Sequence, residues 1–167
     1  MKKHLMVLGF VAAFAPAAFA QDASTVTTAA QFVPMAAVSD LFEIQSGQLA
    51  EKKAQSEHVK TAAAKIVADH TKASKELEAA AKKAGIAFQK PDKLDAKHQQ
   101  MLDELTKADG KSFDQAFDME QLQAHQEAVA MFTAYSTKGD QADVKAFATK
   151  TLPVLQEHLK MFMEMKQ

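Results

Sequence analysis

Small and apolar side chains recur at alternating steps of four and three residues along three stretches of the chain. This spacing aligns side chains along one side of an α-helix, so each stretch predicts a helix that packs against others. A single histidine interrupts each of the three seams. The seams are Val59, Ala63, Ile66, His70, Ala73, Leu77 and Ala80; Asp118, Leu122, His125, Val129 and Phe132; and Val144, Ala148, Thr151, Leu155, His158, Phe162 and Met165.

Capping and turn residues set the expected bounds of these helices and of two others. Gly85 and Gly139 stand where helices end. Ser112 and Gln115 have the spacing of a capping box, and Asp140 is placed to cap the last helix. We therefore expect helices at about 34–53, 56–84, 92–108, 112–138 and 140–165, with Pro34 in the first turn of the first one.

The lengths of the connections predict the architecture. Short turns follow the first helix and the helix at 112–138, whereas a long connector follows the helix at 56–84. This predicts an all-α, ferritin-like four-helix bundle, with a short extra helix in the crossover between helices two and three. The bundle domain is expected to span 34–167. Residues 21–33 have no periodicity and are rich in Ser, Thr and Ala, so we expect a flexible leader there.

The first 20 residues have the pattern of a secretory signal peptide. Two lysines precede an apolar run from Leu5 to Ala17, and Ala18-Phe19-Ala20 has the small residues of a cleavage site. We expect cleavage after Ala20 and a periplasmic or secreted protein, with association with the outer membrane as one variant. No later stretch is apolar and long enough for a transmembrane span.

Composition narrows the classes of partner and site. The chain carries 20 basic residues and 21 acidic ones, for a net charge of −1, and none of the basic residues is arginine. This balance argues against a nucleic-acid partner. The absence of cysteine excludes disulfides and thiolate metal ligands. The sequence identifies no protein partner and leaves a homo-oligomer open.

The seam histidines are the candidate chemistry. His70, His125 and His158 lie on three helices that should face one interior, and Glu43 lies on the fourth, in a stripe with small residues. Three imidazoles and one carboxylate form a suitable ligand set for a divalent transition metal such as zinc, iron or copper. The same four groups can instead hydrogen-bond to one another in a metal-free polar core. Both arrangements are compatible with the pattern.

The register of the last two helices complicates this prediction. If the chain folds back near residue 138, His158 lies about seven residues farther from the turn than His125, or about 10 Å along the bundle at ~1.5 Å per residue. By this count Asp118 is the better neighbour for His158. If the core is metal-free, burial of neutral imidazoles should also depress the pKa values of these histidines.

An ordered set of short motifs resembles a known family, the bacterial domain of unknown function 4142. This family is often labelled a putative outer-membrane protein and grouped with ferritin-like bundles. The resemblance spans about 35–165 and implies a ferritin-like helical fold and an exported protein, but no established reaction. The motifs are Phe42-Glu43-Ile44-x-x-Gly47-x-Leu49-Ala50, Asp69-His70, Phe113-Asp114 followed by His125, and Leu152-Pro153-x-Leu155 with His158.

The sequence suggests three functional hypotheses. The first is an exported metal-binding or stress-associated protein that uses the buried His/Glu cluster. The second is a non-catalytic structural or interaction module with a metal-free polar core. The third is a di-iron redox enzyme, which normally requires Glu-x-x-His motifs. Val67 and Leu155 occupy the glutamate positions of such motifs ahead of His70 and His158, so that motif is absent. We assign no catalytic residue.

Overall fold

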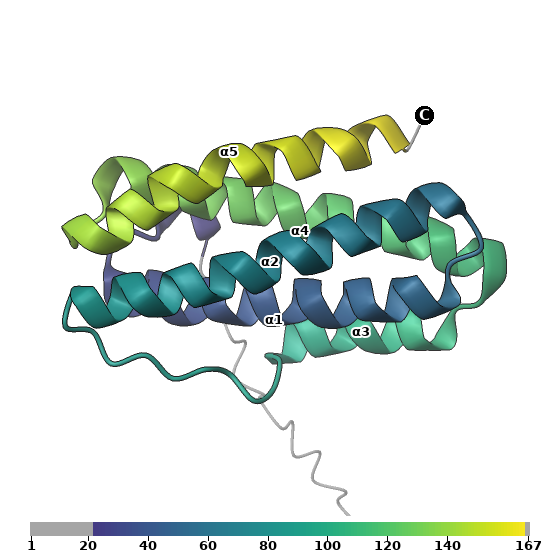
Figure 1. Ribbon diagram of the computed structural model, residues 1–167, viewed down its shortest axis with the longest axis horizontal. Coiled ribbons are helices and arrows are strands. Elements are labelled where there is room, and N and C mark those ends of the chain that lie inside the picture. Colours follow the sequence, from purple (N-terminus) through teal and green to yellow (C-terminus); the bar gives the residue numbers. More distant parts are fainter. Residues whose placement is uncertain (1–21, 166–167) are drawn as a thin grey trace, which may run out of the picture.

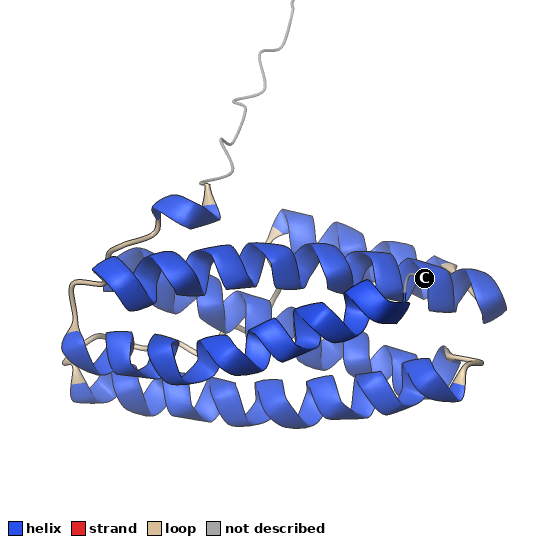
Figure 2. Ribbon diagram, turned by 90° about the horizontal axis from the view of Figure 1, so that it is seen from above, coloured by secondary structure: helices blue, strands red, loops and turns tan. Residues whose placement is uncertain are grey.

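The computed structural model describes residues 22–165, and every regular element in this range is helical (Figures 1 and 2). Residues 1–20, the predicted signal peptide, lie outside the described range. The predicted all-α class is confirmed. The elements are η1 (Ala23–Thr25), α1 (Ala29–Lys53), α2 (Glu57–Lys83), α3 (Ala96–Lys107), α4 (Gly110–Lys138) and α5 (Ala142–Met165).

Four long helices run side by side, and the short α3 lies along one side of them (Figure 1). α1 and α2 form one hairpin and α4 and α5 form another, each closed by a short non-helical turn. Between the hairpins, α2 packs against α5 and α1 packs against α4, while α3 contacts α1 and α4. The long crossover with its extra helix is therefore present as predicted. No helix in the described range has the length and apolar character needed to cross a membrane.

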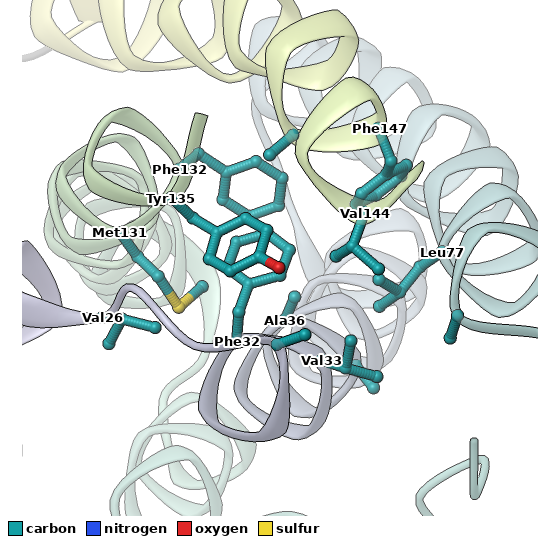
Figure 3. Close-up of a cluster of buried hydrophobic side chains, with 14 of the residues drawn as sticks. Val26, Phe32, Val33, Ala36, Leu77, Met131, Phe132, Tyr135, Val144 and Phe147 are labelled. Atoms are coloured by element: carbon teal, nitrogen blue, oxygen red, sulfur yellow. The ribbon is translucent and has the colours of Figure 1, made fainter. Parts of the chain in front are cut away.

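The bundle starts earlier in the chain than the sequence indicated. Helix α1 begins at Ala29 instead of Pro34, and residues 22–33 are not a flexible leader but part of the packed structure. Phe32 is fully buried, and its ring stacks on Tyr135 with 4.2 Å between centroids (Figure 3). Burial of this aromatic side chain outweighs the local preference of a Ser/Thr/Ala-rich segment for disorder.

Two predicted caps also differ from the structure. Helix α4 begins at Gly110, so Ser112 is not its N-cap; the Ser112 hydroxyl donates a hydrogen bond to the carbonyl of Asp109. The Asp140 carboxylate accepts from the backbone N–H of Ala29 at 2.8 Å, and thus caps α1 instead of α5. The Asp140 cap joins residues 111 positions apart, which local spacing does not encode.

Helices α1 and α2 approach closely beside the polar residues of α1. A Cβ atom at Gly47 would lie 2.7 Å from Cγ2 of Val67 and 3.3 Å from the carbonyl oxygen of Ala63. Only glycine allows this approach without a shift of the neighbouring helix. The contact explains why Glu43, one turn earlier, is almost completely buried.

Buried polar residues form a layer across the middle of the bundle. On each of the four long helices, polar residues lie between two apolar clusters that fill the two ends of the core, except that Thr151 lies within the first of these clusters. That first cluster is shown in Figure 3. A layer of this kind needs internal partners, because buried polar groups without them destabilise the fold. The layer contains Asp40, Glu43, Ser46, His70, Gln121, His125, Thr151 and His158.

Candidate metal centre

Three imidazoles from three helices meet in the polar layer. His70 comes from α2, His125 from α4 and His158 from α5, and all three side chains are buried. One ring nitrogen of each residue lies within 4.8 Å of the others. The distances between ring centroids are 5.2 to 5.7 Å. The structure therefore brings together the three histidines that the seams singled out.

The turn between α4 and α5 removes most of the register offset expected from the sequence. Helix α4 ends at Lys138, but α5 begins only at Ala142, so the residues of the turn do not add to the height of His158. Counted from these two helix ends, the offset between His125 and His158 falls to about three residues, or about 4.5 Å along the axes. Side chains lean toward the N-terminus of their helix, so His125 leans away from the turn and His158 toward it. The two rings meet, and Asp118 is not the neighbour of His158.

His70 is held by a carboxylate from α1. Its Nδ1 lies 2.8 Å from Oδ1 of Asp40, and both residues are buried. Asp40 stands as far before the end of α1 as His70 stands after the start of α2, so the two side chains are level in this hairpin. The other ring nitrogen, Nε2, is buried and has no hydrogen-bond partner in the described structure. That nitrogen is available to a ligand.

His158 is held from the opposite hairpin. Its Nε2 lies 2.9 Å from Oδ2 of Asp69, and the same carboxylate oxygen accepts from Nζ of Lys65 at 2.8 Å. Burial alone would raise the pKa of Asp69, but Lys65 and His158 lower it overall. Asp69 is therefore ionised at neutral pH and requires a proton on Nε2 of His158. This leaves the lone pair on Nδ1.

His125 is oriented by its own helix. Its Nδ1 lies 2.9 Å from the carbonyl oxygen of Gln121, one turn earlier. A carbonyl can only accept, so Nδ1 carries the proton and Nε2 carries the lone pair. That Nε2 lies 3.3 Å from Nδ1 of His158. Two lone pairs thus face each other at the centre of the cluster.

A positive charge between these two nitrogens would stabilise such an arrangement. Burial first, and then His70 and His158, lower the pKa of His125. Burial lowers the pKa of His158 to about 4, although its hydrogen bond to Asp69 acts in the opposite direction, so both rings are neutral at pH 7. For His70, burial lowers the pKa, but Asp40, Glu43 and Asp69 raise it above its ordinary value overall. The uniform depression expected from the sequence is therefore wrong for His70. A divalent ion among the three rings would compete with protons for their inward lone pairs.

Glu43 lies beside this trio without belonging to it. Its Oε1 is 3.8 Å from Nδ1 of His125, the nitrogen that faces Gln121. The residue is 1% exposed, its Oε2 has no hydrogen-bond partner in the described structure, and burial raises its pKa to about 7. Glu43 therefore lies next to His125 but makes no hydrogen bond to it in the described structure.

Two of the groups that hold the cluster, Asp40 and Asp69, were not among the residues predicted from the sequence. Asp40 lies in the same small-residue stripe as Glu43, which was the signal that could have found it. Asp69 was passed over because it lies beside the seam and not on it, since adjacent helical residues point about 100° apart. That direction takes Asp69 away from His70 and toward His158 on α5. Pairing between helices, not within one, makes Asp69 part of the site.

Comparison with known proteins supports the helical architecture. No curated protein matches the sequence. Among solved structures, CopM in the Cu(II)-bound form matches with a TM-score of 0.64 and 20% sequence identity, over 82% of this chain and 94% of that one. At this level of identity, the likeness shows a similar fold and nothing further. The family model for the domain of unknown function DUF4142 matches residues 14–165, and the chain belongs to this family.

Proposed function

We propose that this protein binds one divalent transition metal ion through His70, His125 and His158. The observation that carries the proposal is the pair of inward lone pairs, on Nε2 of His125 and Nδ1 of His158, 3.3 Å apart and beside the free Nε2 of His70. The other ring nitrogen of each histidine, the outward one, faces away from the cluster and lies within hydrogen-bond distance of an oxygen acceptor. Such acceptors fix the tautomer and orientation of a ligating histidine.

Copper is the first metal to test, with zinc and nickel as comparisons. Neutral imidazoles suit zinc, copper, iron and nickel, and Cu(II) has the highest affinity in the divalent series. CopM, which shares the fold, was solved with Cu(II) bound. A nitrogen-rich set differs from the glutamate-rich set of di-iron enzymes, so the ligands offer no support for that alternative.

We also propose that the protein works outside the cytoplasm. The support is the composition of residues 1–20, with a basic start, an apolar run and a small-residue cleavage pattern. In an exported setting the protein would hold or buffer a metal ion. The competing hypothesis is a structural or interaction module in which the same histidines form a closed polar network.

Metal analysis of purified protein tests the proposal. We expect one ion per chain in wild type after equilibrium dialysis, and loss of that ion in His125→Ala and in His158→Gln. His58→Ala is the matched control, because His58 is exposed. Saturating metal at about 100 times the dissociation constant should raise the free energy of unfolding by ~2.7 kcal/mol. Circular dichroism verifies that each variant is helical.

Two results would reject the metal-binding hypothesis. One is a wild-type protein that neither retains nor is stabilised by copper, zinc or nickel. The other is a folded His125→Ala protein with the same metal content as wild type. Either result would favour the metal-free polar core.

A further inference from the structure

A cleft between α2 and α5 leads from the surface to the histidine cluster. It encloses about 70 Å³, and both His70 and His158 line it. Its other walls include Ala73 from α2 and Thr151 and Val154 from α5. A water molecule needs on the order of 10–15 Å³ of such space, so the cleft has room for a few waters or a small anion. The cluster is buried but it is not sealed.

The protein supplies three donors to this centre and no fourth among the described residues. Asp40 and Asp69 are engaged with the outward nitrogens of His70 and His158. Glu43 lies next to the outward nitrogen of His125. All three carboxylates are therefore behind the rings instead of between them. Zn(II) and Cu(II) normally bind at least four ligands, and a site with three protein ligands completes its shell from solvent or substrate.

We infer that a metal ion held by the three histidines keeps one coordination position facing this cleft, open to water and to small anions. The inference rests on the proposed metal binding and specifies the chemistry of that site. The three neutral imidazoles leave the charge of the ion uncompensated within its donor set. Lys72 and Lys150 line the cleft together with Asp69 and Glu76, and Lys150 forms an ion pair with Glu76, so the charges of the walls balance. The positive charge of the ion itself therefore favours an anionic ligand over a neutral one.

Azide is the probe, because it is small, anionic and coordinates Cu(II) with a visible charge-transfer absorption. Protein loaded with Cu(II) is titrated with azide, after the metal content has been measured. Wild type should bind azide saturably. Ala73→Phe fills the cleft and should weaken azide binding by about tenfold or more, with the copper content unchanged. Ala79→Phe, the same substitution at an exposed position of α2, should leave azide binding as in wild type.

Glu43→Gln distinguishes an open position from one occupied by that carboxylate. The inference predicts that wild type and Glu43→Gln bind azide equally well. It is overturned if loaded wild type shows no response to azide, or if the response appears only in Glu43→Gln. It is also overturned if Ala73→Phe and Val154→Phe both bind copper and azide normally.

Metal content separates the two levels of the hypothesis. If wild type binds no metal, the proposed function and this inference both fail. If wild type binds one ion that azide does not reach, metal binding stands and the open position fails. Val154→Phe, on the facing wall of the cleft, replaces Ala73→Phe if the latter does not fold.

Discussion

Hydrogen bonding at the outward nitrogens decides what the three imidazoles present to the centre. The acceptors are a carbonyl on α4 and carboxylates on α1 and α2. They leave Nε2 of His70, Nε2 of His125 and Nδ1 of His158 directed inward. Loss of such an acceptor from a ligating histidine typically weakens metal affinity by about 10- to 100-fold. Asp40 and Asp69 are therefore positioning residues for the proposed site.

Glu43 makes a pH-dependent contribution to stability in the metal-free protein. Its pKa is about 7 in the fold, against 4.5 for the free side chain, because burial favours the protonated form. As pH rises, the unfolded chain loses this proton before the folded protein does. Wild type should therefore lose stability between about pH 4.5 and 7, and the loss should level off above the folded pKa. Relative to Glu43→Gln, the loss should reach roughly 3 kcal/mol.

Urea unfolding between pH 4.5 and 8, in the presence of a chelator, measures this difference. Glu51→Gln, at an exposed position of the same helix, is the control and should run parallel to wild type across the range. A constant gap between wild type and Glu43→Gln would show that Glu43 does not titrate as a buried acid.

The sequence was sufficient to locate the three rings, because each one interrupts a seam of apolar residues at a fixed helical spacing. It was not sufficient for their partners. Whether Asp69 reaches His158 depends on how α2 and α5 are set against each other. The raised pKa of His70 likewise depends on carboxylates that face it from α1. The spacing of residues within one helix predicts neither the contact between Asp69 and His158 nor the effect of the α1 carboxylates on the pKa of His70.

At the scale of elements, helix type and order followed from periodicity, whereas helix ends followed from tertiary contacts. Helix α1 starts at Ala29, ahead of Pro34, since Phe32 packs against the aromatic rings of α4. The backbone N–H of Ala29, the first residue of α1, donates to Asp140, which lies 111 residues later in the chain. A cap of this kind cannot be found from local sequence signals.

Asp140 should therefore stabilise α1 from a distance. Its Oδ1 accepts from Ala29 N–H and from the Tyr135 hydroxyl, at 2.8 and 3.1 Å. Asp140→Ala removes both bonds and should lower the free energy of unfolding by about 1–2 kcal/mol. Asp140→Asn should retain most of the cap. Chemical denaturation measures both, and Asp92→Ala, in the exposed crossover, should have little effect. Equal stability of Asp140→Ala and wild type would contradict the cap.

At the scale of the whole molecule, the site lies between two apolar clusters and away from both ends of the bundle. The clusters stabilise the fold, which allows the middle layer to hold polar groups. The all-α architecture and its long crossover were predictable from helix lengths and loop lengths. The full set of residues in the polar layer was not predictable in this way, because it depends on the positions of the four helices relative to one another along the bundle axis.

The proposed export gives a prediction for the whole chain. When the full sequence is produced in a bacterial host, protein recovered from the periplasm should begin at Gln21. Intact mass spectrometry measures this directly. Ala20→Asp places a charge in the cleavage pattern and should leave the leader attached. Uncleaved wild type confined to the cytoplasm would contradict export.

Along the backbone, the two hairpins are connected through the crossover at 84–95 and α3, and the trio takes one ring from the first hairpin and two from the second. A bound ion would consequently be a reversible crosslink between halves of the protein. If the backbone were cut in the crossover, the two fragments should associate more tightly with metal than with a chelator. Size-exclusion chromatography of the nicked protein would detect this metal-dependent reassembly.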